Sequence, residues 1–241
     1  MTPAADGATG WTVAEVAWVH EGLLRVSIEP SEGPLDPWRA GQFFMRHLDD
    51  PAVRPRSYSV ASPPGAARVE LAIAVHRSGV MGSHWARVRP GDSQRWSGPY
   101  GRFGLPAALP ARVVVVATGT GIAPFRSMLG DLERASEAGV ETWVLHGARR
   151  RDELLFAEEF EAAAARSAIR YRTATSREAA GPGRVAGRVQ SLLDEVVPEP
   201  GTDLFLLCGN PAMVDDVWAS LRTAGFAPAR VRREKFETVD R

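Results

Sequence analysis

The first hundred residues place apolar and polar side chains alternately in short runs, which is the pattern of half-buried β-strands. Proline and glycine separate these runs, as they do in antiparallel barrels and sandwiches. One stretch breaks the alternation, because Met81, Trp85 and Val88 recur at helical spacing before Pro90-Gly91. The pattern predicts an antiparallel β-barrel or sandwich with one short helix between two strands. Strands are expected over residues 11–19, 23–28, 42–48, 56–61, 68–76 and 94–96.

The hydrophobic pattern changes after Pro110. Residues 112–117 form a continuous, mostly β-branched run, typical of a strand that is buried on both faces. Strand-like and helical runs then alternate, and five strands with four helices predict a doubly wound parallel sheet. We therefore expect two domains, residues 1–107 and residues 108–241, with a mobile leader over residues 1–10. The other strands are expected over 141–147, 169–175, 203–208 and 230–236, and the helices over 124–138, 152–167, 187–197 and 212–224.

The composition excludes several classes of protein. The 241 residues carry 29 basic and 29 acidic side chains, and neither half has the basic excess of a nucleic-acid-binding protein. No apolar run is long enough to span a membrane and the first residues do not form a secretory signal, so we expect a cytoplasmic protein. The only cysteine, Cys208, excludes a disulfide framework and a cysteine-ligated iron–sulfur cluster. The five histidines show no metal-ligand spacing, so no metal site is expected.

A glycine-rich segment follows the first strand of the expected parallel sheet. Residues 118–124 read TGTGIAP and precede a helix. Glycines let the backbone approach a ligand closely, and a helix N-terminus offers free N–H groups to an anion. Pro124 stands where the full dinucleotide fingerprint has its third glycine, so the segment alone also fits a plain tight turn. Its position in the first βα turn favours a nucleotide site.

The next two strands end in basic and hydroxyl side chains. Three arginines, residues 149–151, follow the strand over 141–147, where an NAD site needs an acidic residue. The strand over 169–175 is followed by Ser176-Arg177. An arginine with a hydroxyl suits a 2′-phosphate and favours NADP over NAD. Because only one of the 29 basic residues is a lysine, arginines are common in this chain, and a solvated basic loop is an equal alternative.

Several motifs occur in a characteristic order along the chain. Arg56-Ser57-Tyr58-Ser59 comes first, residues 119–124 (GTGIAP) follow, and residues 208–214 (CGNPAMV) come later. Residues 98–101 (GPYG) and 234–236 (EKF) belong to the same set. Together they resemble the ferredoxin–NADP reductase family of FAD enzymes over nearly the whole chain. The resemblance implies an FAD-binding barrel followed by an NAD(P)-binding α/β domain.

The resemblance also implies which residues bind FAD in the first domain. Tyr58 would pack flat against the isoalloxazine, Ser59 would bond the flavin near N5, and Arg56 would pair with the diphosphate. Backbone groups of Val75 and His76 would hold the flavin from the next strand. The start of the short helix would face the FAD phosphates through Met81, Gly82 and Ser83.

On the nicotinamide side, the resemblance places Thr120 between the two cofactor rings. Cys208 and Gly209 would border the nicotinamide, and a small buried core residue is the alternative for a lone cysteine. Glu234 is similar to a glutamate that relays a proton from the last strand, and an exposed strand carboxylate is the alternative. The cofactor loop comprises Gly119, Thr120 and Gly121, and the candidate catalytic residues are Ser59, Cys208 and Glu234.

Four residues are similar to those that bind the 2′-phosphate in NADP-using members of the family. Ser176 and Arg177 match the serine–arginine signature, and Arg149 and Arg188 lie where bacterial members have supporting arginines. At the end of the chain, Phe236 either reaches the flavin ring or leaves that face of the flavin open.

The resemblance implies an FAD-dependent reductase that passes hydride from NADPH, or NADH, to the flavin and then electrons to a separate acceptor. Ferredoxin, flavodoxin or an oxygenase or P450 system is the expected acceptor, and Arg46, Arg54 and Arg77 could form a basic patch for an acidic partner. A flavin, quinone or small-molecule reductase is the first alternative. A regulatory electron-transfer subunit that binds flavin or nucleotide without catalysis is the second.

Overall fold

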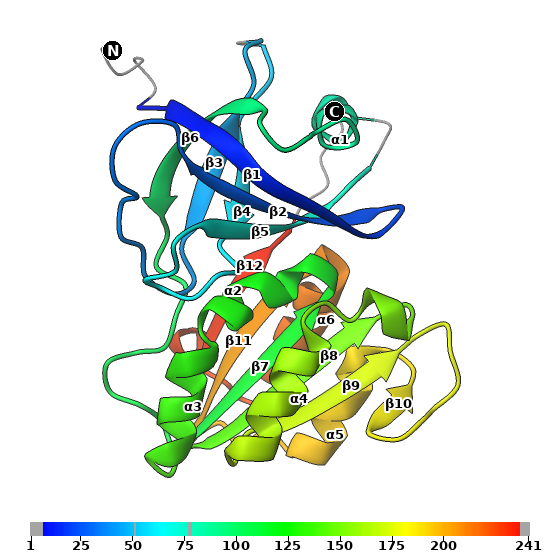
Figure 1. Ribbon diagram of the computed structural model, residues 1–241. Coiled ribbons are helices and arrows are strands. Elements are labelled where there is room, and N and C mark those ends of the chain that lie inside the picture. The colour runs from blue at the N-terminus through cyan, green and yellow to red at the C-terminus, as the bar shows by residue number, and fades with distance from the viewer. Residues whose placement is uncertain (1–6, 51, 77–78, 237–241) are drawn as a thin grey trace. The chain divides into compact units, whose positions relative to one another are not determined.

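The computed structural model describes residues 7–50, 52–76 and 79–236 (Figure 1). The chain forms two compact units that divide between Arg102 and Phe103. This break lies a few residues before the boundary at 107/108 expected from the sequence. Within the described residues, no helix is long and apolar enough to cross a membrane.

The first unit is an antiparallel sheet that closes into a barrel. Its strand order is β4-β3-β6-β1-β2-β5, so β4 and β5 are the two edges. An isolated bridge between Val60 and Leu71 and a 2.7 Å bond from the Ala61 N–H to the Glu70 carbonyl join these edges. The predicted barrel is therefore confirmed. Its elements are β1 (Thr9–His20), β2 (Leu23–Pro30), β3 (Phe43–His47), β4 (Arg56–Ser59), β5 (Val69–Ala74), α1 (Val80–Trp85) and β6 (Ser93–Tyr100).

Alternation along the strands fills the barrel with apolar side chains. Val26, Phe44 and Trp96 are completely buried there and belong to one hydrophobic cluster. Successive side chains of a strand point to opposite faces, so Arg46 shares the inner face of β3 with Phe44. Arg46 is accordingly only 5% exposed.

The burial of Arg46 contradicts the basic surface patch expected from the sequence. Arg54 is exposed, but Arg46 lies inside the barrel and Arg77 lies outside the described residues. Strand alternation decides the position of Arg46, whereas the sequence-based patch rested on charge alone.

The second unit is a parallel sheet of six strands in the order β10-β9-β8-β7-β11-β12. The doubly wound sheet is confirmed, with one strand more than the predicted five. The additional strand, β10, has only three residues between glycines, so it carries too little pattern to be recognised. The strands are β7 (Arg112–Thr118), β8 (Glu141–Ala148), β9 (Arg170–Thr175), β10 (Arg184–Ala186), β11 (Asp203–Gly209) and β12 (Val231–Lys235).

Helices cover both faces of this sheet, with α2, α3 and α4 on one side and α5 and α6 on the other (Figure 1). The second group packs on Val114, Leu145 and Phe205 in one buried cluster. The helices are α2 (Ala123–Ser127), α3 (Leu129–Glu137), α4 (Ala157–Arg166), α5 (Leu193–Val196) and α6 (Pro211–Thr223). Short 3₁₀ turns are η1 (Gly119–Ile122), η2 (Arg151–Glu153), η3 (Val189–Leu192) and η4 (Pro228–Arg230).

Three of the predicted helices are shorter or interrupted. The helix expected over 124–138 divides at Met128 into α2 and α3. The helix expected over 152–167 begins only after Phe156, whose φ of +59° is left-handed and stops a continuous helix. The helix expected over 187–197 is a 3₁₀ turn followed by the single turn of α5.

A buried ion pair fixes the amino ends of the central strands. The Asp203 carboxylate is fully buried and accepts two 2.8 Å bonds from the Arg112 guanidinium on the neighbouring strand. The Glu199 N–H and the Thr202 hydroxyl donate to the same carboxylate at 2.7 and 2.9 Å. With this edge closed by its own polar contacts, the loops at the carboxyl edge are the ones that can receive a ligand.

Candidate functional site

In the barrel, the ring of Tyr58 packs against two tryptophan rings. Its ring meets Trp85 and Trp96 edge to face at centroid distances of 5.4 and 5.7 Å. The Trp85 indole N–H donates to the Tyr58 hydroxyl at 2.7 Å. Burial raises the pKa of Tyr58 to about 12, so the phenol is neutral at physiological pH. The neighbouring Ser59 is buried at the end of β4.

The structure brings the end of β5 and the start of α1 together. The Gly79 N–H donates to the His76 carbonyl at 3.3 Å, and a Cβ at Gly82 would lie 1.6 Å from the same oxygen. Gly82 is therefore required for this close approach. Val75 is buried, whereas His76 is exposed. The predicted FAD residues Val75, His76, Met81, Gly82 and Ser83 thus form one neighbourhood.

In the α/β unit, the glycine-rich segment packs against the end of β11. A Cβ at Gly121 would lie 2.4 Å from the Cys208 carbonyl oxygen, so only glycine fits there. Gly119 has a φ of +55° and open space around its missing side chain. The segment follows β7, and β7 and β11 are neighbours at the point of the sheet where the strand order reverses. Doubly wound sheets bind nucleotides at this point.

Thr118 connects this segment to the loop after β11. Its hydroxyl oxygen accepts a 3.0 Å bond from the Asn210 N–H, 92 residues further along the chain. Gly209 has a φ of +132°, and a Cβ there would lie 2.5 Å from the same hydroxyl oxygen. The Asn210 side chain accepts from the N–H groups of Ala212 and Met213 and so caps α6. Sequence reasoning missed this connection, because nothing local in the sequence signals it.

Cys208 and Glu234 are opposite each other on β11 and β12. Cys208 is fully buried, and burial, with the charge of Glu234, raises the pKa of its thiol. Burial also raises the pKa of the half-buried Glu234, from 4.5 to about 7. The thiol is therefore protonated at neutral pH, while Glu234 can gain and lose a proton there. The Phe236 N–H donates to the Gly209 carbonyl at 2.9 Å, which holds the end of β12 against the same loop.

Backbone bonds gather three loops at the carboxyl ends of β8, β9 and β10. The Ser176 N–H donates to the Ala148 carbonyl at 3.0 Å and the Arg177 N–H to the Arg149 carbonyl at 2.9 Å. The Gly187 N–H donates to the Thr175 carbonyl at 2.9 Å. The four predicted 2′-phosphate residues, Arg149, Ser176, Arg177 and Arg188, therefore lie on converging segments.

The arginines of these loops differ from the other arginines of the α/β unit. Elsewhere in the described part of this unit, each arginine bonds to a carboxylate or to a backbone carbonyl. The exceptions are exposed and have no side-chain ion pair or hydrogen bond in the described structure. These five edge arginines are Arg149, Arg150, Arg151, Arg177 and Arg188. The nearby Glu178 carboxylate does not neutralise them, since it bonds to the Arg151 N–H and lies 3.6 Å from Arg184.

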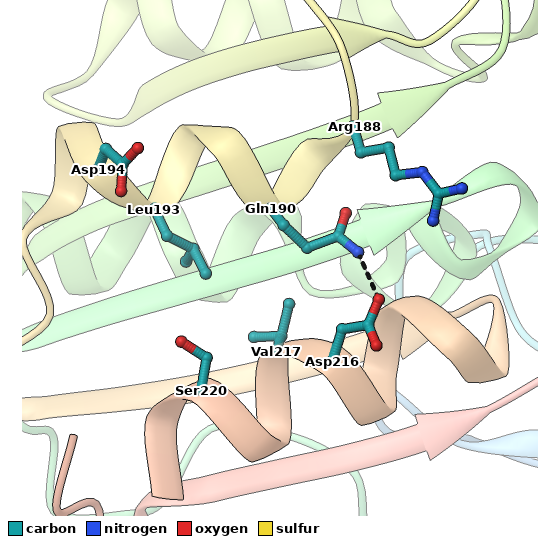
Figure 2. Close-up of a pocket in the computed structure, with 7 residues that line it drawn as sticks. All are labelled: Arg188, Gln190, Leu193, Asp194, Asp216, Val217 and Ser220. Atoms are coloured by element: carbon teal, nitrogen blue, oxygen red, sulfur yellow. Dashed lines mark hydrogen bonds between the residues drawn. The ribbon is translucent and has the colours of Figure 1, made fainter. Parts of the chain in front are cut away.

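A groove of about 340 Å³ begins at Arg188 and runs between η3–α5 and α6 (Figure 2). Gln190 and Asp216 face each other across it and form a 3.2 Å hydrogen bond. Leu193 and Val217 supply its apolar surface. One end of the groove therefore lies at the edge that carries the arginines.

Both nucleotide cofactors implied by the sequence fit these residues. In the α/β unit, the space beside Gly119 is open, and the loops after β8, β9 and β10 carry exposed arginines without ion pairs in the described structure, a side chain that suits phosphate. In the barrel, the buried Arg46 has an Nε–H without a partner, as a site for an anion requires. No group of three or more potential metal ligands gathers among the described residues.

The fold and the candidate cofactor residues of the two units together define a two-domain oxidoreductase that binds a flavin and a nicotinamide nucleotide. Residues 24–104 match the oxidoreductase FAD-binding domain and residues 115–218 the oxidoreductase NAD-binding domain. The chain is 35% identical to ferredoxin–NADP reductase B of Sorangium cellulosum over 202 residues, which cover 80% of this chain and 82% of that protein. It therefore belongs to the ferredoxin–NADP reductase family and is an FAD-dependent enzyme.

Two solved structures show the same fold. The cytochrome P450 reductase of Amycolatopsis matches with a TM-score of 0.83 and 26% identity, over 95% of this chain and 69% of that chain. The ferredoxin–NADP⁺ reductase of Neisseria gonorrhoeae, solved with bound FAD and NADP, matches with a TM-score of 0.80 and 25% identity. That match covers 95% of this chain and 98% of the other.

Proposed function

We propose that this FAD enzyme takes its electrons from NADPH in preference to NADH and passes them to a separate redox protein. The five unpaired edge arginines carry the choice of NADPH. A 2′-phosphate is the group that distinguishes NADPH from NADH, and arginine binds phosphate through paired, charge-assisted hydrogen bonds. Frequent arginines in the chain do not account for the cluster, because those elsewhere in the unit have partners of their own.

The four predicted 2′-phosphate residues have distinct roles in this proposal. Arg177 and Arg149 are tied together through their backbones, so their side chains leave neighbouring points of the edge. Ser176 is exposed beside them and offers a hydroxyl to the same phosphate. Arg188 approaches from the third loop. The first carboxylates of the loop after β8, Asp152 and Glu153, come only after the three arginines 149–151.

The loops after β7 and β11 would hold the nicotinamide half of the nucleotide. Gly119, Thr120 and Gly121 present backbone next to Cys208 and Gly209, and the Thr118–Asn210 bond keeps the two loops in register. When bound, FAD accepts hydride from NADPH and returns the electrons to the acceptor. The buried Cys208 packs beside this site as a neutral thiol, and Glu234 supplies a carboxyl that exchanges protons near neutral pH.

In the barrel, Tyr58 would offer an apolar ring to the isoalloxazine, in an orientation fixed by Trp85. Ser59 would bond the flavin near N5 and Arg56 would pair with the diphosphate. Val75 and His76 would hold the flavin through their backbone, and Phe236 is proposed beside the ring. The start of α1 would add Met81, Gly82 and Ser83 to the FAD site.

The acceptor is proposed from the relatives, which are named as reductases of ferredoxin and of cytochrome P450. A ferredoxin, a flavodoxin or an oxygenase or P450 system therefore remains the expected partner. The cytoplasmic location expected from the sequence also remains a prediction.

An anaerobic absorbance titration tests the proposed function. The purified, FAD-loaded protein is titrated with NADPH and, separately, with NADH. Bleaching of the flavin band at a much lower concentration of NADPH is expected. Bleaching at equal concentrations of both would contradict the NADPH preference, and a protein that binds no FAD would contradict the flavin assignment.

A further inference from the structure

Arg46 is a buried positive charge without a negative partner in the barrel. It is 5% exposed, and no described carboxylate lies within ion-pairing distance of its guanidinium. Its Nη1 donates to the Arg95 carbonyl at 3.3 Å, and its buried Nε has no hydrogen-bond partner. Removing a charge from water without a counter-charge lowers the stability of a protein by roughly several kcal/mol. The barrel alone therefore does not account for an arginine at this position.

No carboxylate forms an ion pair with Arg46 in the described structure. The charge of the exposed Asp49 acts on Arg46 from further away, and it only partly offsets the effect of burial on the Arg46 pKa. Trp96 donates to the Gln94 Oε1 at 3.0 Å, so the amide nitrogen of Gln94 faces His84 Nε2 at 3.3 Å. Arg46 Nη2 faces the same nitrogen at 3.4 Å. With two donors directed at it, His84 Nε2 must be an acceptor and the imidazole must be neutral. Burial, with the charge of Arg46, lowers the pKa of His84 to about 4, in agreement with this assignment.

A second arginine lies directly across the strand pair from Arg46. In the β3–β4 ladder, Arg46 pairs with Arg56, and paired side chains share one face of the sheet. Like charges directly opposite each other are destabilising. Burial lowers the pKa of Arg46 only to about 10, so it stays charged at neutral pH. Two adjacent cations, one of them buried without a carboxylate, are complementary to a ligand with two negative charges.

We propose that Arg46 is the second cation of the FAD diphosphate site and acts together with Arg56. This inference rests on the proposed function, in which Arg56 pairs with the diphosphate. Arg46 contributes in two ways. Its charge acts through a poorly screened interior, and its bond to His84 holds α1, which carries the other proposed phosphate-facing residues.

The position of α1 connects this charge to the flavin side of the barrel. His84 and Trp85 are successive residues of α1, with their rings 5.0 Å apart. His84 contacts Arg46 on β3, and Trp85 donates to Tyr58 on β4. One helix therefore joins the buried charge to the residue proposed to pack on the isoalloxazine.

The substitution Arg46→Met separates binding from folding, because methionine has similar length and suits an apolar interior. Replacing a buried charge with an apolar side chain is often neutral or stabilising. The flavin-free full-length variant is therefore expected to unfold at the same or a higher temperature than the flavin-free wild type. Its FAD dissociation constant, measured by quenching of flavin fluorescence, is expected to rise about tenfold or more.

Arg68→Met is the matched control in the same unit. Arg68 is half-exposed and bonds to Glu29 at 2.8 Å, so its loss should leave FAD binding within about twofold. If wild type binds FAD and Arg46→Met binds it equally well, the inference is wrong while the proposed function stands. If wild type itself binds no FAD, the proposed function fails first.

If Arg46→Met loses both FAD affinity and thermal stability, the variant Arg46→Lys distinguishes a role of the charge from a purely structural role. Lysine keeps the charge but loses the planar fork of arginine. Recovery of FAD affinity in the lysine variant would support the role of the charge. Affinity as weak as in the methionine variant would make Arg46 a structural residue only.

Discussion

The two units of this protein hold the cations proposed to bind phosphate in opposite environments. In the barrel, Arg46 is almost completely buried and has no carboxylate partner. In the α/β unit, the five edge arginines are exposed and equally unpaired. The first arrangement costs folding energy but acts on a ligand through a weakly screened interior, whereas the second costs little and is screened by salt.

Two ionisable groups proposed to serve the cofactors, the buried Arg46 and the half-buried Glu234, also respond differently to burial. Arg46 stays charged at neutral pH although burial lowers its pKa to about 10. Glu234 can lose its charge by taking up a proton, because burial raises its pKa to about 7. A group that must supply a fixed charge and a group that must exchange a proton thus differ in how burial affects them. Three experiments test this comparison, beginning with the largest expected effect.

Removing one edge arginine should affect NADPH alone. Arg177→Ala deletes a guanidinium that makes no ion pair or hydrogen bond within the described structure and keeps the backbone bond to Arg149, so folding should be unaffected. Loss of charge-assisted bonds to the 2′-phosphate should raise KM for NADPH roughly 10- to 100-fold. KM for NADH should stay within about twofold, because NADH lacks that phosphate. Steady-state kinetics with both nucleotides measure the ratio of KM for NADPH to KM for NADH in the variant and in the wild type.

Arg166→Ala is the control for this comparison, since Arg166 is an exposed arginine of the same unit that pairs with Glu133. Neither KM should change in that variant. Equal increases for NADPH and NADH in Arg177→Ala would show that the edge arginines do not recognise the 2′-phosphate.

The sequence was sufficient for the architecture because periodicity is a local property. Alternation before Pro110 and the β-branched run after it separate the barrel from the parallel sheet. Boundaries were less accurate, since pairing with neighbours defines β10 and a left-handed Phe156 delays α4. Such events depend on tertiary contacts that a local pattern does not contain.

The candidate site could be predicted in part. The motifs place Gly121 and Ser176-Arg177 at the carboxyl edge of the sheet, where the structure also has them. In contrast, the Thr118–Asn210 bond spans 92 residues and leaves no local signal. Which arginines lack partners is equally a tertiary property. The same limit explains why Arg46 was expected on the surface. That expectation used the charge of the side chain and not the strand alternation, which places it inside the barrel.

Salt should distinguish the two units. Raising NaCl from about 0.05 M to about 0.5 M shortens the screening length and should weaken NADP⁺ binding roughly tenfold. FAD binding should change by less than about twofold, because Arg46 is shielded from solvent ions. Equilibrium titrations of both ligands in one salt series give, for each ligand, the slope of its dissociation constant against salt concentration on logarithmic axes. Parallel slopes would contradict the contrast between a buried and an exposed cation.

The smallest effect concerns Glu234 and the pH dependence of stability. A carboxyl whose pKa is raised in the folded state binds more protons there than in the unfolded chain. Its stabilising contribution is therefore complete below about pH 4.5 and is lost as the pH rises to about 7. Glu234→Gln stays neutral throughout, so it should match the wild type at low pH and exceed it at pH 8.

The expected difference in unfolding temperature at pH 8 is roughly 2–4 °C, which corresponds to about 1 kcal/mol in a chain of this size. Thermal unfolding of both proteins across this pH range measures it. Glu137→Gln serves as the control, because Glu137 is exposed on α3 and should give a difference that does not vary with pH. A constant difference for Glu234→Gln as well would mean that Glu234 is ionised at neutral pH, and its proposed role in proton exchange would then be wrong.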